Sequence, residues 1–186
     1  MQVTRLLFRE SPYLREAPAR VIGHTAEGGV VLDASIFYAT GGGQPGDSGH
    51  LRWEGGAVEI ATAVKVDGNR IALVPAEPLP LPPLGAEVMQ QLDWGRRFSH
   101  MRVHTALHLL SVAIPLPVTG GQIGAGRGRL DFDMPEAPES PEAIAEAVNH
   151  LIDLDLPVTD SWITDAELQA NPALVKTLSV MPPMGQ

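Results

Sequence analysis

A proline-rich stretch interrupts the sequence and separates two parts with different patterns. It covers residues 75–85, reads PAEPLPLPPLG, and holds five prolines in 11 residues. Proline fixes φ and has no backbone N–H, so this stretch can form neither a helix nor a central strand. We interpret it as a connector between two domains, residues 1–85 and 86–186. A chain of 186 residues is long enough for two small domains that bury apolar side chains.

The part before residue 75 has the pattern of a β meander. Runs of β-branched or alternating apolar residues follow one another over residues 2–74, and turn sequences such as EGG and DGN separate them. Alternation with a period of two puts apolar side chains on one face of a strand, and glycine permits a tight hairpin. We therefore expect a series of strands joined by short turns here.

The part after the proline-rich stretch mixes helices and strands. Apolar side chains at three- and four-residue spacing predict a helix over residues 93–113. Ser140 is typical of a helix start, and a capping-box pattern at Thr164 predicts a short helix. The strands expected in this part cover residues 126–134 and 156–164. Because these elements lack βαβ regularity, the expected fold class is α+β.

The composition excludes several functions and localisations. The chain has no cysteine, so it has no disulfide and no thiolate metal ligand of its own. No signal peptide and no membrane-spanning apolar run is present, so we expect a cytoplasmic protein without a membrane role. A net charge of −9 argues against non-specific binding to nucleic acid. An anionic partner would need a local basic cluster, for which the candidates are Arg96, Arg97, Arg102, Arg127 and Arg129.

Three histidines follow one another at four-residue spacing on the predicted helix. Residues four apart share a helix face, so His104 and His108 can present two imidazole nitrogens to one tetrahedral cation. His100 lies about 80° around the helix from His108, so we interpret it as a surface or supporting residue. Thr105 stands where the zincin metalloprotease motif needs a glutamate. The alternative to a metal site is that His104 and His108 are two polar side chains on a solvated helix face.

Three consecutive glycines, Gly41, Gly42 and Gly43, form the second group of interest. Glycine permits positive φ and a close approach of backbone amides, so the three can surround an anion or a carbonyl oxygen. Gln44 follows directly and offers both a donor and an acceptor. No Gly-Lys-Ser/Thr follows, so the segment is not a Walker loop. The alternative is a glycine-lined turn between strands.

The strings FYATGGGQPGDSGHL, residues 37–51, and DWGRRFSHMRVHTALHLL, residues 93–110, together resemble the free-standing alanyl-tRNA editing proteins of the AlaX type. They also resemble the matching editing region of alanyl-tRNA synthetase. The resemblance implies an N-terminal β-barrel-like module followed by an α+β editing domain, with an antiparallel sheet and a zinc-site helix. It further implies a hydrolase that deacylates mischarged tRNA(Ala) in trans, with the serine-charged form first and the glycine-charged form second.

The resemblance also implies roles for individual residues. His104 and His108 would bind zinc, together with a cysteine and a further histidine from a later Cys-x-x-x-His motif. Gln44 and Thr40 would contact the aminoacyl end in the catalytic pocket and favour an amino acid that bears a hydroxyl. Further contacts to the substrate and its RNA phosphates would come from Gly41, Gly42, Gly43, Arg97 and Arg102.

The sequence departs from the family near its end, because no Cys-x-x-x-His motif occurs before Gln186. We expect the missing ligands to lie beyond this residue. The alternatives are a site that uses a carboxylate such as Asp131 or Asp133, and a site without metal. Two rival functions also remain open: a module that binds aminoacyl-tRNA or an amino acid without hydrolysis, and a structural fragment of a synthetase-like protein.

Overall fold

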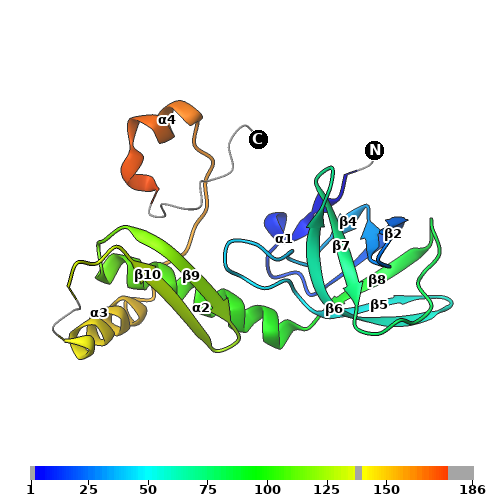
Figure 1. Cartoon of the computed structure of the whole chain (residues 1–186), viewed down its shortest axis with the longest axis horizontal. Helices are drawn as coiled ribbons and strands as arrows, with labels where there is room; N and C mark the ends of the chain where they lie inside the picture. The colour runs from blue at the N-terminus through cyan, green and yellow to red at the C-terminus, as the bar shows by residue number, and fades with distance from the viewer. Residues whose placement is uncertain (1–2, 137–139, 176–186) are drawn as a thin grey trace. The chain divides into compact units, whose positions relative to one another are not determined.

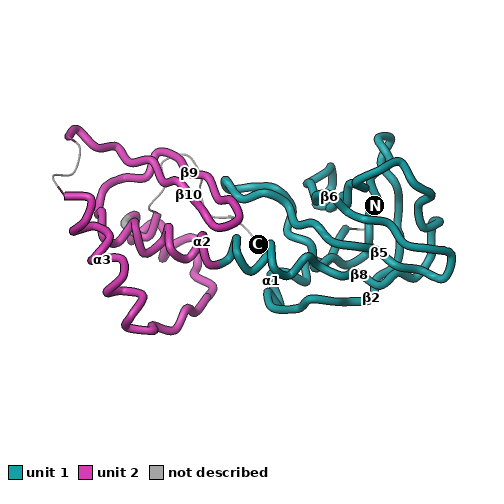
Figure 2. The backbone as a smooth tube through the Cα atoms, turned by 90° about the horizontal axis from the view of Figure 1, so that it is seen from below, with its two compact units in different colours: residues 1–101 teal, residues 102–186 magenta. Residues whose placement is uncertain are grey.

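The computed structural model describes residues 3–136 and 140–175. The chain forms two compact units, residues 1–101 and 102–186, which Figure 2 shows in different colours. The elements that begin in the first unit are β1 (Arg5–Leu6), α1 (Leu7–Glu10), β2 (Glu16–His24), β3 (Val30–Leu32), β4 (Ala34–Ser35), β5 (Gly49–Trp53), β6 (Gly56–Val66), β7 (Arg70–Pro75), β8 (Glu87–Leu92) and α2 (Trp94–Ala113). Those of the second are β9 (Val118–Gly124), β10 (Arg127–Phe132), α3 (Pro141–Asp153), α4 (Asp165–Ala170) and a 3-10 helix (Pro172–Leu174).

Six antiparallel strands of the first unit close into a barrel in the order β2, β3, β7, β6, β5, β8 (Figure 1). In the strands whose burial alternates, one set of side chains points into the barrel. In β5, for example, Leu51 is fully buried and its neighbours His50 and Arg52 are exposed. The barrel confirms the strands expected before residue 75, but its last strand, β8, lies beyond the expected module boundary at residue 85. Its largest buried apolar side chains are Phe37, Leu32, Ile36, Leu51, Ile60 and Leu73.

The proline-rich stretch lies inside the first unit. It leads from β7 to β8, and β8 pairs with both β2 and β5 in the barrel. The interpretation of this stretch as a connector between domains is therefore wrong. Prolines exclude regular structure, but they act in the same way whether a segment joins two domains or two strands of one barrel.

The helices predicted in the second part of the sequence are present. α2 covers almost all of the predicted range. α3 begins after Ser140, whose Oγ accepts a hydrogen bond from the amide of Ala143 at 3.2 Å. α4 begins after Thr164, which forms a complete capping box with Glu167. No helix within residues 3–136 and 140–175 combines the length and the apolar character that a membrane span requires.

The strands of the second unit are only partly as expected. β10 confirms the strand predicted over residues 126–134, and it pairs antiparallel with β9. β9 was not expected, because Gly120 and Gly121 lower the strand propensity of this segment. The strand expected over residues 156–164 is wrong, since these residues are irregular and exposed. Alternation alone does not make a strand where no neighbouring strand supplies hydrogen bonds.

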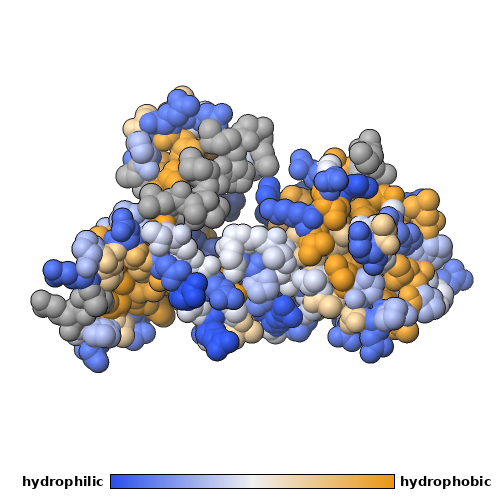
Figure 3. Space-filling model, viewed as in Figure 1, coloured by the Kyte–Doolittle hydropathy of each residue, from blue (hydrophilic) through white to orange (hydrophobic). Residues whose placement is uncertain are grey.

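The second unit keeps part of its apolar surface exposed. Figure 3 shows hydrophobic surface in the region of α3. Ile144 and Val148 on the apolar stripe of this helix are half-buried, and Ile152 is exposed. Side chains of α3 therefore pack less tightly than those of the barrel.

Candidate functional site

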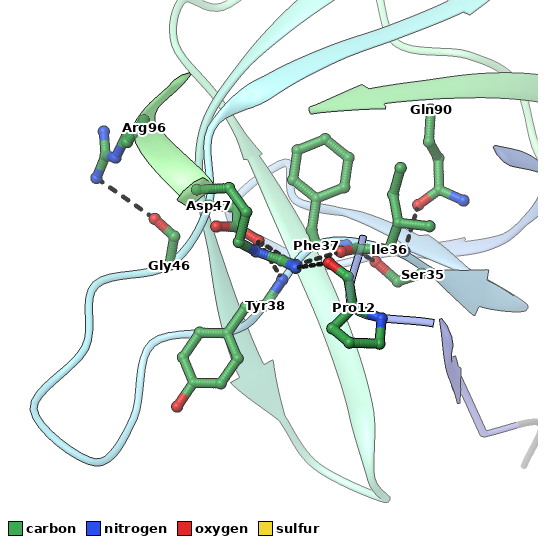
Figure 4. A network of polar contacts seen from close by, with 10 residues as sticks. Pro12, Ser35, Ile36, Phe37, Tyr38, Gly46, Asp47, Gln90 and Arg96 are labelled. Atoms are coloured by element: carbon green, nitrogen blue, oxygen red, sulfur yellow. Dashed lines mark hydrogen bonds and ion pairs between the residues drawn. The ribbon is translucent and has the colours of Figure 1, made fainter. Parts of the chain in front are cut away.

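The glycine-rich loop, residues 39–46, is closed at its base by Tyr38 and Asp47. The Asp47 amide donates to the Tyr38 carbonyl at 2.9 Å, and the Tyr38 amide donates to Asp47 Oδ2 at 2.6 Å. Figure 4 shows the Asp47 carboxylate beside the Tyr38 backbone. Burial, and then the charge of Asp47, raise the pKa of the Tyr38 phenol, which keeps it protonated. Both ends of the loop are thus held together by backbone groups and one carboxylate.

The tip of the loop is a two-residue hairpin turn. Gly41 and Gln44 exchange backbone hydrogen bonds of 3.1 and 3.0 Å. Between them, Gly42 and Gly43 have φ values of 59° and 78°, which favour glycine. These values show the glycine-lined turn that the sequence left open as the alternative to a ligand cradle. The Tyr38 hydroxyl donates to the Gly41 carbonyl at 2.9 Å and so fixes one side of the tip.

Strand β6 holds both flanks of the loop through Ala63. The Thr40 amide and hydroxyl donate to the Ala63 carbonyl at 2.9 and 3.2 Å, and the Gly46 amide donates to Thr40 Oγ1 at 2.9 Å. A Cβ atom on Gly46 would lie 2.3 Å from the Ala63 oxygen, so no larger residue fits there. The Thr40 hydroxyl therefore uses its donor and one lone pair within the fold, and one lone pair remains.

An ion pair buried in the first unit fixes the end of the loop. Arg97 lies on α2 and contacts Asp47 Oδ2 through Nη2 at 2.7 Å and through Nε at 2.9 Å. The same guanidinium donates to the carbonyls of Ile36 at 2.7 Å and Pro12 at 3.0 Å. One side chain thus connects the first turn of α2, the segment after β4 that leads into the loop, and the N-terminal segment.

These contacts correct the expectation for Arg97, which is buried and paired and so does not face RNA phosphates. Arg102, the other predicted phosphate contact, is exposed on α2. Arg129 is also exposed and pairs with Asp131 at 3.0 Å. Sequence spacing could not distinguish these arginines, because the partner of Arg97 lies 50 residues earlier in the chain.

His100 is also buried, so its expected place on the surface is wrong and a supporting role remains. Its side chain is 1% exposed, and its Nδ1 has no hydrogen-bond partner among the described residues. Asp47 Oδ1 is likewise buried and unpaired in the described part of the chain. Burial, and then the charge of Arg96, lower the pKa of the His100 imidazole. His100 is therefore neutral at physiological pH.

His104 and His108 lie one turn apart on α2, as the spacing predicts. Their rings are nearly parallel, with centroids 4.9 Å apart and an angle of 15° between the planes. His104 is half-buried and His108 is exposed. Burial, and then the neighbouring His108, lower the pKa of His104, so its imidazole is neutral at pH 7. A neutral imidazole is the form that binds a metal ion.

The two imidazoles suit half of a tetrahedral zinc site. Within residues 3–136 and 140–175, no group of three or more histidine, aspartate or glutamate side chains is placed to hold a metal ion. Asp131, one of the carboxylates considered as a further ligand, pairs with Arg129 instead. Any further ligands in this chain must therefore come from outside the described residues or from a rearrangement of them.

Gln44 and Thr40 lie on the same loop but differ in exposure. Gln44 is 5% exposed, although it stands directly beside the glycine turn. Thr40 is exposed even though its hydroxyl bonds to β6. The loop therefore presents the exposed backbone of Gly42 and Gly43, whereas Gln44 is buried.

A cluster of aromatic rings, which the sequence did not predict, lies at the start of α2. Trp94 and Phe98 on α2 stack with centroids 5.6 Å apart, and Tyr13 approaches Trp94 at 5.9 Å. The guanidinium carbon of Arg15 lies 4.6 Å from the centre of the Trp94 ring. The four-residue spacing of Trp94 and Phe98, which puts both rings on one face of the helix, was the signal in the sequence.

The sequence is similar to proteins that charge or edit tRNA. The family described as tRNA synthetases class II (A) matches residues 14–96. Alanine–tRNA ligase from Pyrobaculum arsenaticum is 37% identical over 164 residues, which cover 83% of this chain and 18% of the ligase. Alanyl-tRNA editing protein AlaX-M from Pyrococcus horikoshii is 36% identical over 143 residues, which cover 73% of this chain and 63% of that protein.

The chain spans less than a fifth of the length of the ligases that it matches, with 18% of the Pyrobaculum arsenaticum enzyme covered. Its match to the much shorter AlaX-M covers a larger share of that protein. Both the barrel with its glycine-rich loop and the start of α2 fall within the family match. The chain is therefore similar in sequence both to alanine–tRNA ligases and to an AlaX-type alanyl-tRNA editing protein.

Proposed function

We propose that this chain is a trans-editing hydrolase that removes serine, and secondarily glycine, from mischarged tRNA(Ala). The observation that carries the proposal is its similarity to AlaX-M, whose name describes alanyl-tRNA editing. In the reaction, water attacks the carbonyl carbon of the aminoacyl ester and the bond to the ribose oxygen breaks. The products are a free amino acid and a tRNA with a restored hydroxyl.

The glycine-rich loop supplies donors for this reaction in the proposed mechanism. Negative charge develops on the carbonyl oxygen as water attacks, and fixed backbone amides stabilise such a charge. Gly41, Gly42 and Gly43 can approach a substrate closely because they have no side chains. The contacts of Tyr38 and Thr40 hold the loop in place before substrate arrives, so little ordering is needed during the reaction.

Thr40 and Gln44 select the amino acid in this proposal. The lone pair that remains on Thr40 Oγ1 can accept a hydrogen bond from a serine hydroxyl, which glycine does not have. Gln44 orients the aminoacyl group next to the turn. Because a missing hydrogen bond leaves a polar group unpaired, we expect serine to be removed faster than glycine.

His104 and His108 would hold the proposed zinc ion through their imidazole nitrogens. Bound zinc supplies a Lewis acid that polarises the ester carbonyl or orients the attacking water. Burial lowers the pKa of His104, so its imidazole is neutral at pH 7 and able to bind the ion. Arg102, exposed on the same helix, is the proposed contact for an RNA phosphate.

Deacylation assays on three substrates test the proposal. Serine-, glycine- and alanine-charged tRNA(Ala) are incubated separately with the chain, and the remaining ester is measured over time. We expect hydrolysis of the first two forms and little hydrolysis of the correctly charged third. Gln44→Ala and His104→Ala should each lower the rate, whereas Trp162→Ala, an exposed residue of the second unit, should not.

The assays also separate this function from its rival. A binding module would retain affinity for aminoacyl-tRNA and protect the ester from spontaneous hydrolysis. If activity stays full in excess chelator, the proposed role of zinc is wrong, but the proposed hydrolase function stands. Absence of hydrolysis with all three substrates, at enzyme concentrations that saturate RNA binding, would contradict the proposed function.

A further inference from the structure

The aromatic cluster on the first unit combines exposed rings with a cation. Tyr13 is 66% exposed and Phe98 is 40% exposed, while Trp94 between them is half-buried. None of the three belongs to the hydrophobic core of the barrel. Trp, Tyr and Phe together make up only nine of the 186 residues, so three of the nine lie in this one exposed cluster.

The arrangement of the rings is suited to flat, π-rich partners. Trp94 and Phe98 are nearly parallel, with an angle of 23° between their planes, and Tyr13 is tilted by 50° against Trp94. Aromatic side chains that stack on one another leave outer faces on which a nucleic-acid base can stack. Unpaired bases have such faces free, while the bases of a duplex already stack on one another. The cluster therefore fits a single-stranded nucleic acid better than a duplex.

The charges beside the rings favour the same partner. Arg15 is exposed and lies over Trp94, which allows it to contact a phosphate next to a stacked base. Arg96, two residues after Trp94, donates to the carbonyl of Gly46 at 3.4 Å. The carboxylate of Asp93, next to Trp94 in the chain, accepts a hydrogen bond from the Arg96 amide at 3.1 Å and remains a negative charge at this end of the helix. One cation, Arg15, therefore lies against the rings in a protein whose net charge is −9.

We propose that Tyr13, Trp94 and Phe98 form a stacking platform for unpaired RNA bases, with Arg15 as a phosphate contact. The proposal rests on the proposed function in one respect, because it takes RNA as the substrate. The bond from Arg96 to Gly46 places the start of α2 next to the end of the glycine-rich loop. A single strand on the platform would therefore leave the RNA close to the loop that we assign to the ester.

Binding of uncharged RNA tests the platform without any catalytic step. The anisotropy of a labelled single-stranded RNA of about eight nucleotides is compared with that of a blunt duplex of the same length. We expect the chain to bind the single strand more tightly. Tyr13→Ala and Phe98→Ala should each weaken binding of the single strand by about 5- to 150-fold, which is the usual range for one lost stacking contact.

Matched variants distinguish stacking from a change in fold or charge. Tyr13→Phe keeps a ring and should retain the affinity. Trp162→Ala removes an aromatic side chain that is 82% exposed in the second unit, and it should leave the affinity unchanged. Arg15→Gln should reduce the slope of log affinity against log salt by about one, whereas Phe98→Ala should leave that slope unchanged. Thermal unfolding of each variant checks that the barrel remains folded.

The outcomes separate the platform from the editing function. If Tyr13→Ala and Phe98→Ala bind the single strand as the unsubstituted chain does, the platform proposal is overturned, whatever the deacylation rate. Equal weakening by Trp162→Ala, or equal affinity for the blunt duplex, would also overturn it. If the variants lose binding as expected while no substrate is deacylated, the platform stands and the proposed hydrolase function fails.

Discussion

Arg97 and Asp47 form an ion pair at 2.7 Å, and their side chains are only 4% and 1% exposed. The pair joins a helix residue to the residue that ends the glycine-rich loop. Asp47 Oδ2 also accepts the amide of Tyr38, so the carboxylate serves the loop and the helix at once. Each of these buried charges is stabilised by the opposite charge of its partner. If one side chain is removed, the other is left as an unpaired charge away from water, which is strongly destabilising.

Arg97→Met should therefore destabilise the first unit strongly. The buried carboxylate of Asp47 loses its cation, and breaking a buried pair in this way costs about 3–5 kcal/mol. Urea unfolding of the variant measures the loss. The double variant Asp47→Asn with Arg97→Met removes both charges and should be more stable than the single variant.

The exposed pair of Arg20 and Glu87 provides the control for that experiment. These side chains meet at 3.3 Å but are 59% and 84% exposed. Arg20→Met should change the free energy of unfolding by less than about 1 kcal/mol, because water screens an exposed pair. Equal losses for Arg97→Met and Arg20→Met would contradict the role assigned to the buried pair.

Gly46→Ala should distort the loop, because the new Cβ would lie 2.3 Å from the Ala63 carbonyl oxygen. We expect a loss of about 1–3 kcal/mol in unfolding free energy, the usual cost of forcing extra volume into a packed site. Gly23→Ala is the matched control, since a Cβ there meets nothing within 4 Å. Hydrogen exchange at the amides of Gly41 and Gln44 should rise only in the Gly46 variant.

The stability of the first unit should fall as the pH falls, and His100 should be one cause. Burial lowers the pKa of this imidazole below its ordinary value of 6.5, so the unfolded chain takes up a proton more readily than the folded chain. The stabilisation is fully present above pH 6.5 and is lost as the pH falls toward and through the lowered pKa. Unfolding midpoints measured between about pH 7.5 and 5 follow this change.

Substitution of His100 shows how much of the pH dependence of the unfolding free energy comes from this residue. His100→Gln cannot take up the proton, so its unfolding free energy should depend less steeply on pH below 6.5. His150→Gln is the comparison, because His150 is exposed on α3. An unchanged slope in His100→Gln would assign the pH dependence to other groups.

Zinc affinity should depend on both His104 and His108. Because removal of residues that only support a metal ligand already weakens binding by about 10- to 100-fold, loss of one ligand should cost at least as much. Competition with a chromophoric chelator measures the affinity of His104→Ala, His108→Ala and the control His150→Ala. Equal zinc binding in all three would contradict the assignment of the pair.

The sequence predicted those features that depend only on residues close to one another in the chain. The caps at Ser140 and Thr164 depend on side chains three residues away, so the sequence was sufficient for them. The positive φ of Gly42 and Gly43 follows from glycine at a short turn. The one-turn separation of His104 and His108 likewise follows from helix geometry.

Long-range pairing accounts for what the sequence did not predict. The burial of Arg97 depends on Asp47, 50 residues earlier, and a run of arginines on a helix is more often a solvated face. The proline-rich segment could be placed only once β8 was known to pair with β2 and β5. Tyr13 meets Trp94 through tertiary packing, which single-sequence periodicity does not encode.

The turn at the tip of the glycine-rich loop could be altered without rebuilding the barrel. The hydrogen bonds that hold the loop come from Tyr38, Thr40 and the residues at its base. What the fold requires of residues 42 and 43 is mainly their positive φ. Asparagine and aspartate also tolerate that conformation, and each would add one polar side chain at the tip. A small library at these two positions would therefore change the chemistry of the tip while the barrel stays as it is.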